Sequence, residues 1–419
     1  MIETPKNILV VTVGGSCEPI VNAIGTPPSY DFVYFICSKG GGKRASEFQV
    51  DGSGAPCVGS KKMPSIVEQV GLREDRYEKV TFDVDTHVDN LAILYKDLKG
   101  VAQAIRERFP GARVIANYTG GTKSMSAALV LVAIEVGWDL QVNKGMRENV
   151  VKIEAGDIPV PVATDGFYSE RNRTLFQDAF NNFNYSMAKM VADATLRALR
   201  LSPTEESQWH EWRAIADGFN LWDSFFYGQA LTVLKPVASR VKSYMPFLSY
   251  LTSDRKEARY YTCLDLILNA ERRAHQGRFD DAISRLYRAL ELLAQTRLME
   301  RFNLDTGHLD IKDTRIPASF REKYAQKANE KGIFHVALVE AYDLLQELDD
   351  PVGHEFDSQR SRLLDMLHKR NYSFLAHGFG PIDSGTYKRM YEVIKGFVDK
   401  CIKELELKII WPPQLPRKL

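Results

Sequence analysis

Short apolar runs alternate with amphipathic stretches along the first third of the chain. Residues 7–13 are almost continuously apolar, as expected of a strand that a parallel sheet buries on both faces. Further strands are predicted at residues 31–37, 77–84, 114–117, 138–142 and 150–154, the last two as a hairpin, and helices at residues 90–109 and 122–134. Strands that alternate with helices indicate an α/β sheet of Rossmann type.

The pattern changes after Ile158-Pro159-Val160-Pro161, which we interpret as a linker. Beyond residue 166 the apolar positions recur with helical spacing, and almost no strand pattern remains. Helices are predicted at residues 172–201, 209–241, 262–277, 280–302, 334–348, 358–376 and 385–407, with 262–277 and 280–302 as an antiparallel pair. Because 419 residues exceed the usual size of a single core, we predict an α/β domain at 1–162, an added helical layer at 166–255 and an all-α domain at 256–419.

Two of the predicted strands end in glycine turns that lead into helices. The first turn is Gly14-Gly15-Ser16, and the second runs through Asn117-Tyr118-Thr119-Gly120-Gly121-Thr122-Lys123. Glycines let the backbone approach a ligand closely, and a helix N-terminus offers unpaired N–H groups and a positive dipole end. Ligands of such sheets bind at the carboxyl ends of the strands, so both turns are predicted to line one anion site. The alternative is a pair of ordinary turns with serine or threonine caps and no ligand.

Several nucleotide-binding classes are disfavoured by motif. A Walker A loop needs glycine directly before its lysine and another five residues earlier, and here Thr122 and Asn117 occupy those positions. No G-x-G-x-x-G follows a strand, which disfavours a dinucleotide-dependent enzyme. A transcriptional regulator is disfavoured because we find no helix-turn-helix with a basic recognition helix.

Composition adds further limits. The net charge of +1 excludes a global basic field for nucleic acid, so any such site must be local. The five cysteines show no CxxC pair or zinc spacing, which predicts reduced thiols in a cytoplasmic protein and no metal or other cofactor. No signal peptide is visible, and no apolar run reaches the roughly 18 residues of a membrane helix.

A second candidate site lies near the C-terminus. Arg370, Ser373 and His377 are predicted to share one face of the helix at 358–376, with His377 in its last turn before Gly378. An arginine can hold a phosphate through two hydrogen bonds, and a histidine can move a proton near neutral pH, so together they could cleave RNA without a metal. The alternative is a structural pair, with Arg370 satisfied by a carboxylate and His377 capping the helix. Cleavage by proton transfer usually needs two proton carriers, and one such pair offers only one. A dimer would bring two copies of the pair together.

The two sites, in this order, resemble the CARF–HEPN ribonucleases of type III CRISPR systems. The CARF-like features are Val13-Gly14-Gly15-Ser16 with Glu18-Pro19-Ile20-Val21, and residues 117–123. The HEPN-like features are Arg370 and His377 with six residues between them, the Asn371 that follows the arginine, Asn269-Ala270-Glu271, and residues 285–292. The resemblance covers residues 7–160 and 260–405.

The resemblance implies a homodimer that binds one cyclic oligoadenylate, a tetra- or hexa-adenylate, and then cleaves single-stranded RNA. The implied catalytic residues are Arg370, Asn371, Ser373 and His377, and the implied ligand-binding residues are Gly14, Gly15, Ser16, Ser38, Asn117, Thr119, Gly120, Gly121, Thr122 and Lys123. Some CARF domains also degrade their activator slowly, and Ser16, Asn117 or Thr119 would position a 2′-hydroxyl for that reaction. The competing interpretation is a sensor whose helical half is a non-catalytic docking or regulatory module.

Overall fold

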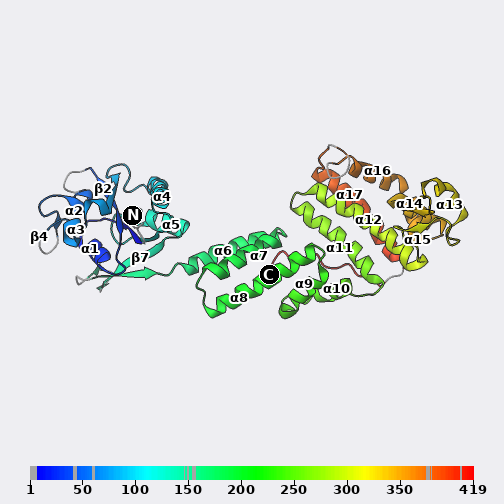
Figure 1. Ribbon diagram of the computed structural model, residues 1–419, viewed down its shortest axis with the longest axis horizontal. Helices are drawn as coiled ribbons and strands as arrows, with labels where there is room; N and C mark the ends of the chain where they lie inside the picture. Colours follow the sequence, from blue (N-terminus) through cyan, green and yellow to red (C-terminus); the bar gives the residue numbers. More distant parts are fainter. Residues whose placement is uncertain are drawn as a thin grey trace. The chain divides into compact units, whose positions relative to one another are not determined.

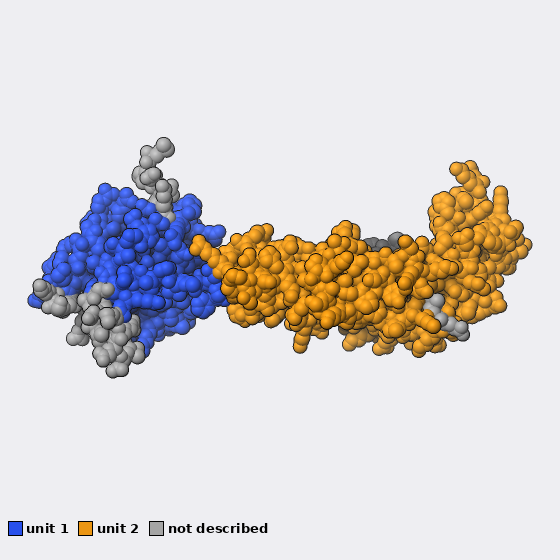
Figure 2. All heavy atoms as spheres, turned by 90° about the horizontal axis from the view of Figure 1, so that it is seen from below, with its two compact units in different colours: residues 1–167 blue, residues 168–419 orange. Residues whose placement is uncertain are grey.

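The structure is a computed structural model that describes residues 7–40, 45–58, 62–145, 147–148, 151–152, 157–373, 378, 380–405 and 408–419 (Figure 1). The chain divides into two compact units, residues 1–167 and 168–419, which Figure 2 colours separately. The first unit is an α/β sheet and the second is helical, so the predicted fold class is confirmed. None of the helices in the described part of the chain is both long and apolar enough to cross a membrane.

The first unit is built on a six-stranded sheet in the order β10-β7-β6-β1-β2-β5. Its strands are β1 (Asn7–Thr12), β2 (Phe32–Lys39), β5 (Tyr77–Asp83), β6 (Arg113–Asn117), β7 (Asp139–Lys144) and β10 (Ile158–Val162). Neighbouring strands from β5 to β7 pair in parallel, and β10 pairs antiparallel with β7. The Rossmann-type sheet predicted from the alternation of strands and helices is therefore present.

Helices bury both faces of this sheet. Ile8 and Val10 of β1 belong to the core beneath α4 (Leu91–Arg108) and α5 (Lys123–Val136). Leu9 and Val11 belong to a second core with α1 (Glu18–Gly25), α2 (Glu47–Asp51) and α3 (Ile66–Val70). Successive residues of a strand point to opposite faces, and here both faces are covered, which explains the continuous apolar run.

Two predictions about the last strands are wrong. Residues 158–161 are not a linker but part of β10, which pairs with β7 from Ile158 opposite Lys144 to Val162 opposite Leu140. Proline is tolerated there because β10 is an edge strand, where a missing N–H removes no bond to an outer neighbour. Of the predicted hairpin of 138–142 with 150–154, the structure describes only residues 151–152 of the second strand, and these form β9 (Val151–Lys152), which pairs instead with β8 (Arg147–Glu148).

The prediction of five reduced thiols is also wrong. Cys17, directly before α1, forms a disulfide with Cys57 of β3 (Cys57–Val58), which pairs with β4 (Lys62–Met63). Both residues are buried in the core that lies under α1, α2 and α3. They are 40 residues apart in sequence, so spacing gives no sign that the fold brings their α-carbons to 5.7 Å. Cys37, Cys263 and Cys401 are free and buried.

The second unit contains two cores. One core gathers α7 (Tyr185–Ala198), α8 (Pro203–Asp223), α9 (Tyr227–Leu234), α10 (Met245–Leu251) and most of α6 (Asp165–Asn181). The other gathers α11 (Glu257–His275), α12 (Phe279–Phe302), α13 (Ala318–Tyr324), α14 (Leu338–Glu347), α15 (Pro351–Ser358), α16 (Arg360–Asn371) and α17 (Ser384–Glu404). A two-stranded pair, β11 (Leu309–Asp310) with β12 (Ile333–Phe334), joins the second core. The predicted division at residue 255 stays a prediction.

The helix predictions differ in accuracy. The antiparallel pair is confirmed as α11 and α12, with Gly277 in the turn at a φ of +74°. The single helix predicted at 172–201 is instead α6 and α7, because the Asn184 side chain caps a new helix by accepting from the Met187 N–H. The helix predicted at 358–376 begins at Arg360 and ends at Asn371, which matters for the second site.

Candidate functional site

The two glycine turns lie against each other at the carboxyl edge of the sheet. β1 and β6 are neighbours, with Val11 opposite Asn117. A Cβ on Gly14 would lie 2.7 Å from the Gly121 nitrogen, and a Cβ on Gly120 would lie 2.2 Å from the Thr12 carbonyl oxygen. These glycines are therefore required for the two backbones to touch, and the predicted convergence of the turns is confirmed.

The Asn117 side chain anchors the second glycine turn, residues 117–123. Its side chain is fully buried and donates to Gln141 Oε1 at 3.0 Å and to Asn143 Oδ1 at 2.9 Å, while Asn117 Oδ1 accepts from the Thr119 N–H. The Thr119 hydroxyl and the Asn143 N–H are 2.8 Å apart and hydrogen-bonded. The Asn117 amide is thus committed within the protein, where it fixes the turn that a ligand would meet.

Three other predicted ligand residues have hydroxyls used within the fold. Thr122 caps α5 by accepting from the Met125 N–H, and its hydroxyl donates to the Val88 carbonyl at 2.6 Å. Ser38 and Ser46 exchange hydrogen bonds, each N–H donating to the other hydroxyl. The Thr119 hydroxyl accepts from the Asn143 N–H. The side chains of these three residues therefore hold the edge of the sheet in shape. A ligand would meet their backbone groups instead.

The groups that remain open to solvent are Gly15, Ser16 and Lys123. All three are exposed, and a Cβ on Gly15 would meet nothing within 4 Å. Lys123 begins α5, and no ion pair joins it to another residue in the described ranges. A cation beside a helix N-terminus, next to an open glycine turn, suits a phosphate of a ligand.

Sequence reasoning missed Thr12, Gln141 and Asn143. The Thr12 hydroxyl donates to the Gly120 carbonyl at 2.7 Å, and Asn143 Nδ2 donates to the Pro19 carbonyl at 2.7 Å. These bonds tie both glycine turns and the start of α1 into one unit. A signal was available, since Gln141 and Asn143 alternate with the apolar Leu140 and Val142 in β7, and amides buried there need hydrogen-bond partners.

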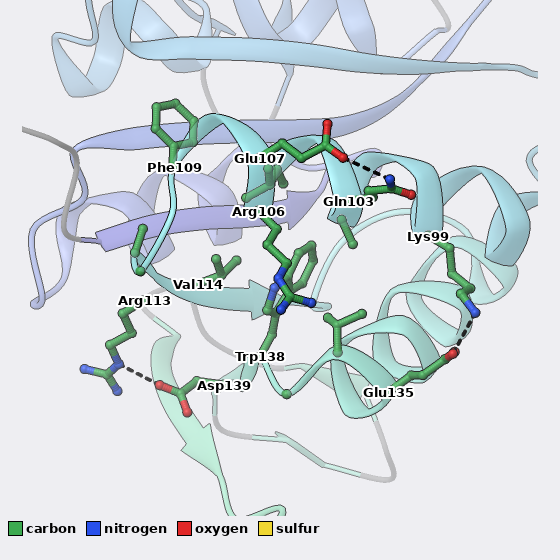
Figure 3. A pocket seen from close by; sticks show the side chains of 16 residues that line it. Lys99, Gln103, Arg106, Glu107, Phe109, Arg113, Val114, Glu135, Trp138 and Asp139 are labelled. Atoms are coloured by element: carbon green, nitrogen blue, oxygen red, sulfur yellow. Dashed lines mark hydrogen bonds and ion pairs between the residues drawn. The ribbon is translucent and has the colours of Figure 1, made fainter.

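A groove of about 1080 Å³ lies at the opposite edge of the sheet, where α4 and α5 end and β6 and β7 begin (Figure 3). Four of the charged residues that line it form two ion pairs, Lys99 with Glu135 at 2.6 Å and Arg113 with Asp139 at 2.6 Å. Both helices end at this groove, and helix C-termini disfavour anions. We therefore keep the carboxyl edge as the candidate anion site.

The second candidate site is at the end of α16. The Arg370 guanidinium lies 4.3 Å from the centre of the Tyr287 ring on α12, and its Nη1 donates to Asn371 Oδ1 at 3.2 Å. Its Nε is buried and has no hydrogen-bond partner in the described part of the chain. No carboxylate of the described residues forms an ion pair with Arg370, so the alternative in which a carboxylate satisfies it finds no support there.

Tyr287 provides a neutral ring beneath this cation. Burial is the main cause that raises the pKa of Tyr287, and the neighbouring Glu291 raises it further. The phenol therefore stays protonated at neutral pH, and Arg370 rests on an aromatic face rather than on an anion. A guanidinium held in this way keeps its positive charge available to a phosphate.

The chain turns back directly after α16. The Gly378 N–H donates to the Ser373 carbonyl at 3.1 Å, and the Gly380 N–H donates to the Tyr372 carbonyl at 3.2 Å. Ser373 is buried, and its hydroxyl has no hydrogen-bond partner among the residues that the structure describes. The prediction that Arg370, Ser373 and His377 share one helix face is wrong, because α16 ends at Asn371. His377 itself lies outside the described residues.

Comparisons with known proteins bear on both units. No curated protein matches the chain. Residues 252–400 match the family model of the Csm6 HEPN domain. Among solved structures, the chain is similar to Enterococcus italicus Csm6 bound to cyclic hexa-2′-fluoro-hexa-dAMP, with a TM-score of 0.58, 11% identity and 95% of each chain covered.

A further match is Can2 from Sulfobacillus thermosulfidooxidans in complex with cyclic tetra-adenylate. Its TM-score is 0.21 at 16% identity, over 55% of this chain and 68% of that chain, which is too weak to support an argument. The likeness to the Enterococcus protein shows a shared fold along almost the whole chain. Together with the domain match, it confirms the predicted resemblance to CARF–HEPN proteins.

Proposed function

We propose that the protein is an endoribonuclease switched on by a cyclic oligoadenylate, because residues 252–400 match the Csm6 HEPN family model and the chain shares the fold of a solved Csm6. The substrate is single-stranded RNA, and the reaction needs no metal. The activator binds at the glycine turns of the first unit, and the cleavage site includes Arg370 and His377.

The observation that supports this proposal best is the state of Arg370. It lies within the matched domain, rests on the Tyr287 ring, and has no carboxylate partner in the described part of the chain. A structural arginine in a partly buried position is normally neutralised by a carboxylate. An arginine that keeps its charge beside Asn371 is suited to bind a phosphate.

The proposed reaction is a transesterification within the RNA. A base removes the proton of a ribose 2′-hydroxyl, and the 2′-oxygen attacks the adjacent phosphorus. The bond from phosphorus to the 5′-oxygen breaks, an acid protonates that oxygen, and the products are a 2′,3′-cyclic phosphate and a 5′-hydroxyl. Arg370 stabilises the negative charge of the phosphorane, and His377 moves a proton.

A homodimer completes this scheme. One copy supplies a single histidine to the site, whereas two copies related by a two-fold axis supply two proton carriers and two arginines. The same axis allows one cyclic oligoadenylate, itself nearly symmetric, to bind two sets of Gly15, Ser16 and Lys123. The cyclic activator is a tetra- or hexa-adenylate. The similar Enterococcus structure contains an analogue with six nucleotides.

Two substitutions test the proposal. Arg370→Ala and His377→Ala should each lower cleavage of labelled single-stranded RNA by about 100-fold or more at saturating activator. Binding of a labelled cyclic adenylate should be unchanged, because neither residue belongs to the first unit. Full activity in either variant would remove that residue from the mechanism.

A further inference from the structure

Tyr372, two residues after Arg370 in the chain, exposes its ring to solvent. Its exposed fraction is 72%, and no large hydrophobic residue in the described ranges is more exposed, although Ile410 equals it. The next residue, Ser373, is only 1% exposed. The chain therefore passes from a largely exposed tyrosine to a buried serine between one residue and the next.

The backbone that carries this ring is held firmly. The Tyr372 N–H donates to the His368 carbonyl at 3.1 Å, and the Tyr372 carbonyl accepts from the Gly380 N–H at 3.2 Å. Gly378 packs so closely that a Cβ there would lie 2.0 Å from the Tyr372 carbonyl oxygen. A tyrosine has only two side-chain torsions, so a ring on a fixed backbone loses little freedom when a ligand stacks on it.

The residues directly before Tyr372 in the chain are basic. The last turn of α16 contains His368, Lys369 and Arg370, and Arg370 is the cation that no described carboxylate neutralises. Lys369 pairs with Asp365 at 2.8 Å, whereas Arg370, two residues before Tyr372, has no such partner in the described ranges. An exposed ring beside an available guanidinium is the combination that binds single-stranded nucleic acid, through base stacking and phosphate contact.

We propose that Tyr372 is a nucleobase-stacking site, on which one base of the RNA lies while Arg370 holds a neighbouring phosphate. This inference rests on the proposed function. Stacking requires the ring face and not the hydroxyl, because every nucleobase offers a π-surface. A base placed on Tyr372 would fix the position of the scissile phosphate relative to Arg370, so this site would set which bond is cut.

The test compares four variants of the full chain with saturating cyclic oligoadenylate. Tyr372→Ala should raise the KM for labelled single-stranded RNA about tenfold, the loss expected when one base no longer stacks. Tyr372→Phe and Tyr372→Trp should stay within about twofold of the wild type, because both keep a ring. Ile410→Ala is the matched control, since Ile410 is equally exposed, and it should change nothing.

A binding assay separates this inference from the proposed function. The probe is a 2′-O-methylated oligonucleotide, which has no 2′-hydroxyl to react, and its affinity is followed by fluorescence anisotropy. We expect Tyr372→Ala to weaken binding about tenfold. A wild type that binds this probe through Tyr372 but cleaves no RNA would disprove the proposed function and leave the stacking site intact.

Other outcomes would overturn the stacking site. An active wild type whose KM and probe affinity are both unchanged by Tyr372→Ala would exclude Tyr372 from RNA binding. Conversion of Tyr372→Ala to a monomer would show that the ring contacts a second copy of the chain instead. A wild type that neither cleaves RNA nor binds the probe would contradict both proposals.

Discussion

The guanidinium of Arg370 lies 4.3 Å from the centre of the Tyr287 ring. The two residues come from different helices, α16 and α12, that pack in the same core. The ring therefore fixes where the cation lies without neutralising it, which a carboxylate would do. The proposed chemistry depends on this choice of partner.

Tyr287→Leu should lower the kcat for RNA cleavage about tenfold, because a cation–π contact of about 1–2 kcal/mol no longer positions Arg370. Tyr287→Phe keeps the ring face and should stay within about twofold of the wild type. The measurement is steady-state cleavage at saturating RNA and activator. Equal activity of the Leu and wild-type proteins would show that Arg370 needs no aromatic support.

Gly378→Ala should abolish RNA cleavage while the second unit stays folded. The added Cβ would lie 2.0 Å from the Tyr372 carbonyl oxygen, so the chain could not close onto the end of α16. The control is Gly396→Ala in α17, where a Cβ meets nothing within 4 Å and should stabilise the helix by about 0.5–1 kcal/mol. Activity and thermal melting of both variants check this. A fully active Gly378→Ala protein would refute the importance of the close approach.

Lys123→Ala should raise the activator concentration for half-maximal cleavage by about tenfold or more, because a charge-assisted contact of about 1.5–3 kcal/mol is lost. The maximal rate and the melting temperature should not change, since Lys123 is exposed and pairs with no described residue. Lys96→Ala, a change at another exposed lysine of the first unit, is the control. If Lys123→Ala did not change the activator concentration for half-maximal cleavage, Lys123 would be excluded from ligand binding.

Reduction of the Cys17–Cys57 disulfide should destabilise the first unit by up to about 4 kcal/mol, because the bond closes a loop of about 40 residues in the unfolded chain. The measurement is thermal unfolding with and without a thiol reductant. Cys57→Ser should melt like the reduced protein under both conditions. Identical melting of the wild type with and without reductant would show that this bond adds nothing to stability.

Local signals in the sequence predicted the sheet and its glycine turns well. Residues 7–13 are apolar throughout because two layers of helices cover β1, and Gly14 and Gly120 occur where two backbones touch. Thr122 was placed at a helix start, and it is the N-cap of α5. Each of these features depends on residues close together in the chain, which is why pattern and propensity reveal them.

Features that depend on distant residues were missed. Cys17 meets Cys57 only through the fold, and β10 contains prolines that are tolerated only at a sheet edge. The end of α16 was placed too late because the hydrogen bond from the Gly378 N–H to the Ser373 carbonyl competes with further helical turns. The support of Arg370 by Tyr287 joins residues more than 80 positions apart, and no spacing rule predicts it.

The most direct test of the account is cleavage of labelled single-stranded RNA by the purified full chain, measured across a panel of cyclic oligoadenylates of different ring size, with and without a metal chelator. We predict no cleavage without activator, strong cleavage with one ring size, tetra- or hexa-adenylate, and the same rate when the chelator is present. Cleavage that no cyclic adenylate stimulates, or that stops when divalent metal is removed, would contradict the account.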